Sequence, residues 1–161
     1  MNADSRCRRR GLTETALIAE DLRRWDNAAH EVDPDVRLMM WADPLNPFHN
    51  GKRVLAEPDA FKRVPKDIIQ CVWFYGSRDP LTRGLKSLEF FSGHGISTTG
   101  SPWYNRACAV NWGRAARGAV QRKWPFIGLL YTSWHRRWDA LAPTAGAAWK
   151  MPTPDSEHTG K

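Results

Sequence analysis

The sequence predicts an α/β fold in which short parallel strands alternate with helices. Four apolar runs of strand length are separated by segments with helical periodicity, an alternation typical of parallel strands joined by right-handed helical crossovers. The runs are apolar almost throughout, as expected of parallel strands that are covered on both faces. They recur about every 30 residues, which is the repeat of a barrel built from eight strand–helix units.

In the first half of the chain, helical periodicity and turn residues define the expected elements. A helix is predicted from Thr13, a suitable N-cap, to about residue 30, where Asp33-Pro34-Asp35 follows. Its predicted apolar face consists of Ile18, Leu22, Trp25, Ala29 and Val32. The elements expected next are a strand at 36–41, a polar loop at 42–52, a short helix at 58–63 and a second strand at 67–75.

The second half repeats the pattern. Pro80 suits the first turn of a helix whose predicted buried face consists of Leu81, Leu85, Leu88 and Phe91. Short strands are expected at 96–99 and 126–131, and helices at 105–123 and 138–149. The inward residues predicted for the helix at 105–123 are Cys108, Trp112, Ala115 and Ala119.

Composition indicates one folded domain at 12–149, with disordered tails expected at 1–11 and 150–161. The chain has 161 residues, 42% of them hydrophobic, and nine tryptophans, enough to bury a core. No apolar run reaches the length that spans a bilayer, and no apolar segment follows the N-terminal arginines as in a secretory signal. The three cysteines are widely spaced without a C-x-x-C motif, so reduced thiols and a cytoplasmic location are expected.

Aromatic and polar residues follow every predicted strand. The first strand ends in Trp41 and Asp43, and the later strand ends supply Trp73, Tyr75, Trp103, Tyr104, Asn105, Trp134 and His135. In parallel α/β folds, ligand sites form at the carboxyl ends of the strands. Aromatic rings suit the apolar C–H face of a sugar, whose hydroxyl edge needs polar partners, so a carbohydrate pocket is predicted there. The alternative is that these tryptophans fill the core.

Four of these runs resemble a known family. RLMMWAD (37–43), VPKDIIQCVWFY (64–75), GISTTGSPWYN (95–105) and GLLYTSW (128–134) are similar to the second half of the catalytic barrel of family 20 glycoside hydrolases, the β-N-acetylhexosaminidases and their relatives. The resemblance covers about residues 12 to 140. It implies that the first predicted strand corresponds to the fifth strand of that barrel. The matching positions are Trp41, Asp43, Pro65, Asp67, Trp73, Tyr104, Asn105 and Trp134.

One departure from the family concerns catalysis. The family's general acid is the Glu of an Asp-Glu pair after its fourth strand, and no Asp-Glu dipeptide occurs in this chain. Asp43 and Asp79 are the candidates for a substitute carboxylate pair, provided that they face each other across adjacent strand ends. No metal site is expected, because His49, His94 and His135 lack ligands at metal-binding spacing, and no cofactor is expected.

Half a barrel has consequences for assembly. Four parallel strands cannot close, so a homodimer that completes an eight-stranded barrel is expected, with an overlying helix as the alternative. The expected function is binding of N-acetylhexosaminides, with weak or no hydrolysis. Two other functions stay open. One is a self-associating scaffold, and the other is a polyanion or nucleic-acid binder, since the net charge is +7.

Overall fold

A four-stranded parallel sheet organises the protein. The computed structural model describes residues 11–149, so the tails predicted at 1–11 and 150–161 lie outside the described residues, apart from Gly11. The strands are β1 (Met39–Trp41), β2 (Ile69–Trp73), β3 (Thr98–Ser101) and β4 (Phe126–Leu129), and they lie in the order β1-β2-β3-β4. All three pairings are parallel. The predicted α/β fold with parallel strands is therefore confirmed.

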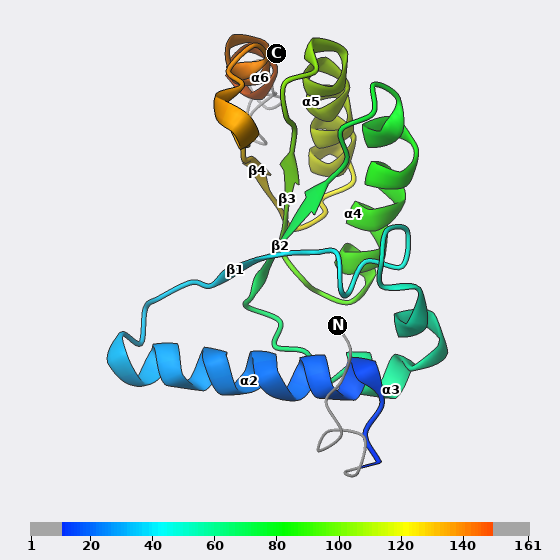
Figure 1. Cartoon of the computed structure of the whole chain (residues 1–161), viewed down its shortest axis with the longest axis vertical. Coiled ribbons are helices and arrows are strands. Elements are labelled where there is room, and N and C mark those ends of the chain that lie inside the picture. Colours follow the sequence, from blue (N-terminus) through cyan, green and yellow to red (C-terminus); the bar gives the residue numbers. More distant parts are fainter. Residues whose placement is uncertain (1–10, 150–161) are drawn as a thin grey trace, which may run out of the picture.

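Helices alternate with the strands along the chain. The α-helices are α2 (Glu14–Val32), α3 (Pro58–Phe61), α4 (Arg83–Gly93), α5 (Arg106–Gln121) and α6 (Leu141–Trp149). Short 3-10 turns are η1 (Lys52–Ala56), η2 (Asp79–Leu81) and η3 (Trp134–Arg136). Figure 1 shows α4 and α5 on one side of the sheet, and α2 across the end where β2 begins. In the described part, no helix is both long enough and apolar enough to cross a membrane.

Polar caps begin the two longest helices. The side chain of Thr13 accepts a hydrogen bond from the Ala16 amide at 3.2 Å, as predicted for the N-cap of α2. The Asn105 side chain does the same for the Cys108 amide at 3.1 Å, at the start of α5. Asn105 therefore has a structural task at the very position where a sugar-binding residue was predicted.

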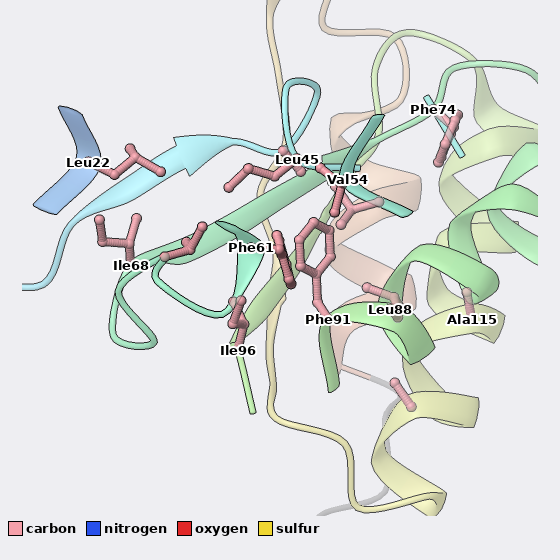
Figure 2. Close-up of a cluster of buried hydrophobic side chains, with 14 of the residues drawn as sticks. Leu22, Leu45, Val54, Phe61, Ile68, Phe74, Leu88, Phe91, Ile96 and Ala115 are labelled. Carbon is pink, nitrogen blue, oxygen red and sulfur yellow. The ribbon is translucent and has the colours of Figure 1, made fainter. Parts of the chain in front are cut away.

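The main core lies between the sheet and the helices α4 and α5. Its buried side chains include Val72, Phe74, Leu88, Phe91, Trp112 and Ala115. Figure 2 shows Phe61 and Phe91 side by side in this cluster, with Leu22 and Ile68 at its edge. Trp112 donates an indole hydrogen bond to the Phe74 carbonyl at 3.1 Å, which satisfies the polar atom of a fully buried ring. The predicted inward face of the helix at 105–123 is confirmed.

The opposite face of the sheet is formed by the alternate residues of each strand. Val72 and Phe74 belong to the helix-side core, so Cys71 and Trp73 point the other way. In the register, Trp41 lies opposite Cys71, and Trp73 lies opposite Ser101. We call this second surface the inner face.

Two residues that were predicted to lie on the buried face of α2 are exposed, so this part of the prediction was wrong. Trp25 is 69% exposed and Val32 is 87% exposed, whereas the buried residues of α2 end at Leu22. The reason is positional, since Figure 1 shows the C-terminal half of α2 extending away from the other helices. Leu81 is also exposed, because it lies in the 3-10 turn η2 rather than in α4.

Candidate functional site

The aromatic residues predicted at the four strand ends come together into one cluster, which we call the aromatic mouth. Its members are Trp41, Trp73, Tyr75, Trp103, Tyr104, Trp134 and His135. The Trp73 and Tyr75 rings stack at a centroid distance of 4.8 Å, and Tyr75 lies 5.2 Å from Trp103. Because all four strands are parallel, their carboxyl ends meet at one edge of the sheet, and this places the rings in contact.

The segment after β4 crosses back over this edge. Trp134 lies in η3, and its ring centroid is 5.8 Å from that of Trp41, which ends β1. The strands β1 and β4 are at opposite ends of the sheet order. The contact therefore links the end of β1 to the segment that follows β4 and makes the mouth a compact unit.

Indole N–H groups fix the orientation of three rings. Trp73 donates to Asp43 Oδ1, Trp134 donates to the Tyr75 hydroxyl at 2.7 Å, and Trp103 donates to the Trp134 carbonyl at 3.0 Å. Each N–H is thus satisfied within the protein, so the ring faces are what these tryptophans offer to a ligand. Trp134 is 47% exposed and Tyr104 is 38% exposed, and His135 is exposed as well, so these three rings are accessible to a ligand.

Few polar groups line the same region. Asp43 is half-buried at the end of β1, with Trp73 as its donor. The imidazole of His49 packs 4.1 Å from the Trp73 ring, and its Nδ1 atom is buried with no hydrogen-bond partner among the described residues. Sequence reasoning considered His49 only as a metal ligand and missed its place beside the mouth. The feature of the sequence that could have indicated this place is the position of His49 in the polar loop that follows Trp41.

The structure gives the two carboxylates of the predicted pair different partners. Asp79 Oδ2 accepts a hydrogen bond from Arg83 Nη2 at 2.8 Å, and the Arg83 guanidinium lies 4.7 Å from the ring centroid of Phe74, a core residue on the helix side. Asp43 instead serves Trp73 on the inner face. The ion pair with Arg83 therefore ties Asp79 to the start of α4, whereas Asp43 is tied to the end of β2.

Backbone strain marks the segment that crosses the mouth. His135 and Arg136 have positive φ values of 56° and 57°, a left-handed conformation that costs non-glycine residues about 1–2 kcal/mol each. The Tyr131 hydroxyl donates to the Arg137 carbonyl at 2.9 Å, and Arg137 lies 4.9 Å from the Tyr104 ring centroid. These contacts, with the Trp134 hydrogen bond, hold the strained segment in place.

Comparison with known proteins adds no relatives. The chain matches no protein-family model, no curated protein and no solved structure.

Proposed function

We propose that the aromatic mouth binds carbohydrate, with N-acetylated hexosamines as the ligand class that the family 20 resemblance suggests. One observation carries this proposal: rings from all four strand ends form a continuous cluster with fixed orientations, and its outer members, Trp134 and Tyr104, are exposed. A pyranose presents an apolar C–H face that packs on such rings. Asp43 and His49 both contact Trp73 and would serve the hydroxyl edge of the sugar.

The proposed activity is binding rather than turnover. Hydrolysis by the family's route needs an acid that protonates the leaving oxygen, and the chain has no Asp-Glu pair to supply it. Of the two candidate replacements, Asp43 accepts a hydrogen bond from Trp73, and Asp79 forms an ion pair with Arg83. Asp43 therefore orients a ring and a sugar hydroxyl in this proposal, and Asp79 has no catalytic part.

We further propose that the chain is half of an eight-stranded barrel, completed by a second copy. Two observations support this. The strands follow each other in sequence order, as barrel strands do, whereas a doubly wound sheet reverses its order at a switch point. In addition, Met39 and Ile127 are large exposed apolar residues on the two edge strands β1 and β4, where a partner's strands would pair.

Ligand binding is tested by titrating N-acetylglucosamine against the protein while the indole N–H signals are followed by NMR. Expected shifts fall on Trp134 and Trp103, and Trp134→Ala reduces affinity at least about tenfold, the loss typical of an aromatic contact. Trp149→Ala is the matched control, because Trp149 is exposed at the end of α6, outside the mouth. Absence of any shift at high millimolar sugar would refute the proposal.

Assembly is tested separately by light scattering after size exclusion. A homodimer is expected, and Ile127→Lys on β4 should convert it to monomer. Leu55→Lys is the control, since Leu55 is also exposed but lies in η1, away from the sheet edges. A monomeric wild-type chain would overturn the half-barrel proposal without deciding sugar binding. A dimer that does not bind N-acetylglucosamine would favour the function of a self-associating scaffold.

A further inference from the structure

A second group of reactive side chains lies at the opposite end of the sheet. Asp26 and His30 occupy neighbouring turns of α2, and Asp67 precedes β2. One possible metal-ligand atom from each of the three lies within 4.8 Å of the others. The fold thus brings one histidine and two carboxylates together from a helix and a distant loop. None of the three belongs to the aromatic mouth.

The hydrogen bonds of this group leave ligand atoms unsatisfied. His30 Nδ1 lies 2.9 Å from the Asp26 carbonyl oxygen, so in the neutral ring Nδ1 carries the proton and Nε2 keeps its lone pair. Backbone anchoring of one ring nitrogen in this way is typical of metal-binding histidines. Asp26 Oδ1 is inaccessible to solvent and has no hydrogen-bond partner among the described residues. Its nearest cationic neighbour is His30 Nδ1 at 3.5 Å.

An ion pair between His30 and Asp26, 3.5 Å apart, accounts for only part of this arrangement, because Asp26 Oδ1 accepts no hydrogen bond within the described residues. The Asp26 side chain is only 14% exposed, and a buried carboxylate oxygen without a hydrogen bond is costly. A hydrogen bond from protonated His30 to Asp26 Oδ1 would relieve that cost, but the Nδ1 hydrogen is directed to the backbone carbonyl instead. A cation placed among the three side chains would satisfy Oδ1 directly.

We propose that Asp26, His30 and Asp67 bind a divalent transition-metal ion of the zinc class. One imidazole with two carboxylates suits Zn²⁺, whereas Mg²⁺ and Ca²⁺ prefer ligand sets made of oxygen alone. Zinc–ligand distances of about 2.0–2.2 Å place tetrahedral ligand atoms about 3.4 Å apart, so the group must contract slightly on binding. Asp67 is exposed and can swing inward to complete the site, with water as the fourth ligand.

Zinc at this position would anchor the C-terminal half of α2. The buried residues of that helix end at Leu22, and its packing partners in the structure are α3 and η1. Asp26 and His30 lie beyond Leu22, on the half that Figure 1 shows extending past the other helices. A bound ion would tie this half to the segment that leads into β2.

The test is a calorimetric titration of metal-free protein with Zn²⁺. It is done in a Cys7→Ser background, because a free thiol binds zinc itself. One ion per chain is expected, with at least about a hundredfold weaker binding in His30→Gln and Asp67→Asn. His94→Gln is the matched control, because His94 Nδ1 makes the same contact with the carbonyl four residues earlier, at 2.8 Å, but among the described residues His94 belongs to no group of three possible metal ligands.

A second readout reports on the helix itself. Zn²⁺ should slow amide hydrogen exchange in residues 23–32 of the parent protein and leave it unchanged in Asp67→Asn. Zinc affinity that is the same in His30→Gln, Asp67→Asn and His94→Gln would overturn the proposal, and so would failure of the parent protein to bind. In either case the three side chains form only an ion-pair network.

Discussion

The indole N–H of Trp73 donates a hydrogen bond to Asp43 Oδ1, and this contact ties the end of β1 to the end of β2. It also fixes the ring that stacks on Tyr75 and contacts His49. Asp43 was predicted to act as a catalytic carboxylate, but its partner gives it a positioning task. Polar contacts of this kind therefore hold the aromatic mouth together with the contacts between rings.

Removal of the Asp43 carboxylate should destabilise the protein. Asp43→Ala leaves the half-buried Trp73 N–H without an acceptor, so the free energy of unfolding should fall by about 1–3 kcal/mol. Asp43→Asn keeps a neutral acceptor and should lose only about 0.5–1.5 kcal/mol. Urea unfolding at one fixed chain concentration measures both, because the stability of any dimer depends on concentration.

The control for Asp43 is a carboxylate on the surface. Asp59 pairs with Lys62 at 2.9 Å, with both side chains exposed to solvent that screens their charges, so Asp59→Ala should leave stability nearly unchanged. Equal losses for Asp43→Ala and Asp59→Ala would show that the Trp73 hydrogen bond contributes nothing beyond an exposed ion pair.

A methyl group at Gly100 should disrupt the contact between β3 and α5. A Cβ there would lie 2.5 Å from Trp112 Cε3, and that ring is fully buried. Gly100→Ala should therefore cost about 1–3 kcal/mol through overpacking. Gly146→Ala is the contrasting variant, since none of the described atoms lies within 4 Å of its added Cβ, and α6 should gain about 0.5–1 kcal/mol of helix stability. Thermal unfolding compares them, and similar losses would contradict the packing argument.

Substitution of Asn105 separates a capping task from a sugar-binding one. Asn105→Ala removes the acceptor for the Cys108 amide and should cost about 0.5–2 kcal/mol. Asn105→Asp keeps the cap and places a negative charge at the N-terminus of α5, so stability should be retained. Chemical unfolding of both variants, beside the sugar titration, is the measurement. If Asn105→Asp is as unstable as Asn105→Ala, the cap is not what stabilises α5.

Strand periodicity predicted the sheet and the aromatic mouth because local pattern determines both. An apolar run ends where polar residues begin, and parallel strands place all such ends at one edge. The contact between Trp41 and Trp134 could not be predicted in this way, because it depends on how η3 crosses the sheet. By contrast, the partner of Asp79 was readable in the sequence, because Arg83 lies four residues later, at the spacing of a helical ion pair.

The apolar pattern of α2 predicted a longer buried face than the structure shows, for a related reason. Periodicity identifies an apolar stripe, but it does not say how far along the helix the core extends. Trp25 continues the stripe and yet lies past the sheet. Asp26 and His30 lie four residues apart and therefore on one side of the helix, which is a readable signal, whereas the approach of Asp67 depends on the fold and not on local spacing.

Cys108 should make stability fall at alkaline pH. Burial raises the pKa of its thiol to about 12 from an ordinary value of 9.0. Between those values the unfolded chain loses the proton and the folded chain keeps it, so its contribution is complete below pH 9 and is lost as pH rises toward 12. Cys108→Ala should show a shallower decline as the pH rises from about 9 toward 12. Parallel declines would contradict the assignment.

The same burial should protect the thiol from reagents. Only the thiolate is nucleophilic, so Cys108 should react with a disulfide reagent solely after unfolding, and Cys71, whose pKa burial also raises, should do the same. Mass spectrometry of peptides from labelled native and unfolded protein identifies the site of reaction. Rapid labelling of Cys108 in the native protein would show that the core beside Phe74 opens readily.

Tyr75→Phe should release the segment that crosses the aromatic mouth. The Tyr75 hydroxyl accepts the Trp134 N–H at 2.7 Å, and the following His135 and Arg136 are strained by their left-handed backbone. A net hydrogen-bond contribution of about 0.5–1.5 kcal/mol is comparable to that strain, so its loss should let residues 132–138 open more often. Amide hydrogen exchange should accelerate by about three- to tenfold there and stay constant in β2 and β3.

Tyr104→Phe is the matched control for this exchange experiment. Its hydroxyl makes no hydrogen bond within the described residues, while its ring keeps the contacts with Trp103 and Arg137. Exchange at 132–138 should therefore match the wild type. If Tyr75→Phe also leaves exchange unchanged, the ring contact between Trp41 and Trp134 holds the segment alone. If both tyrosine variants accelerate it, the aromatic mouth is mobile as a whole, and its rings are not the fixed platform that sugar binding requires.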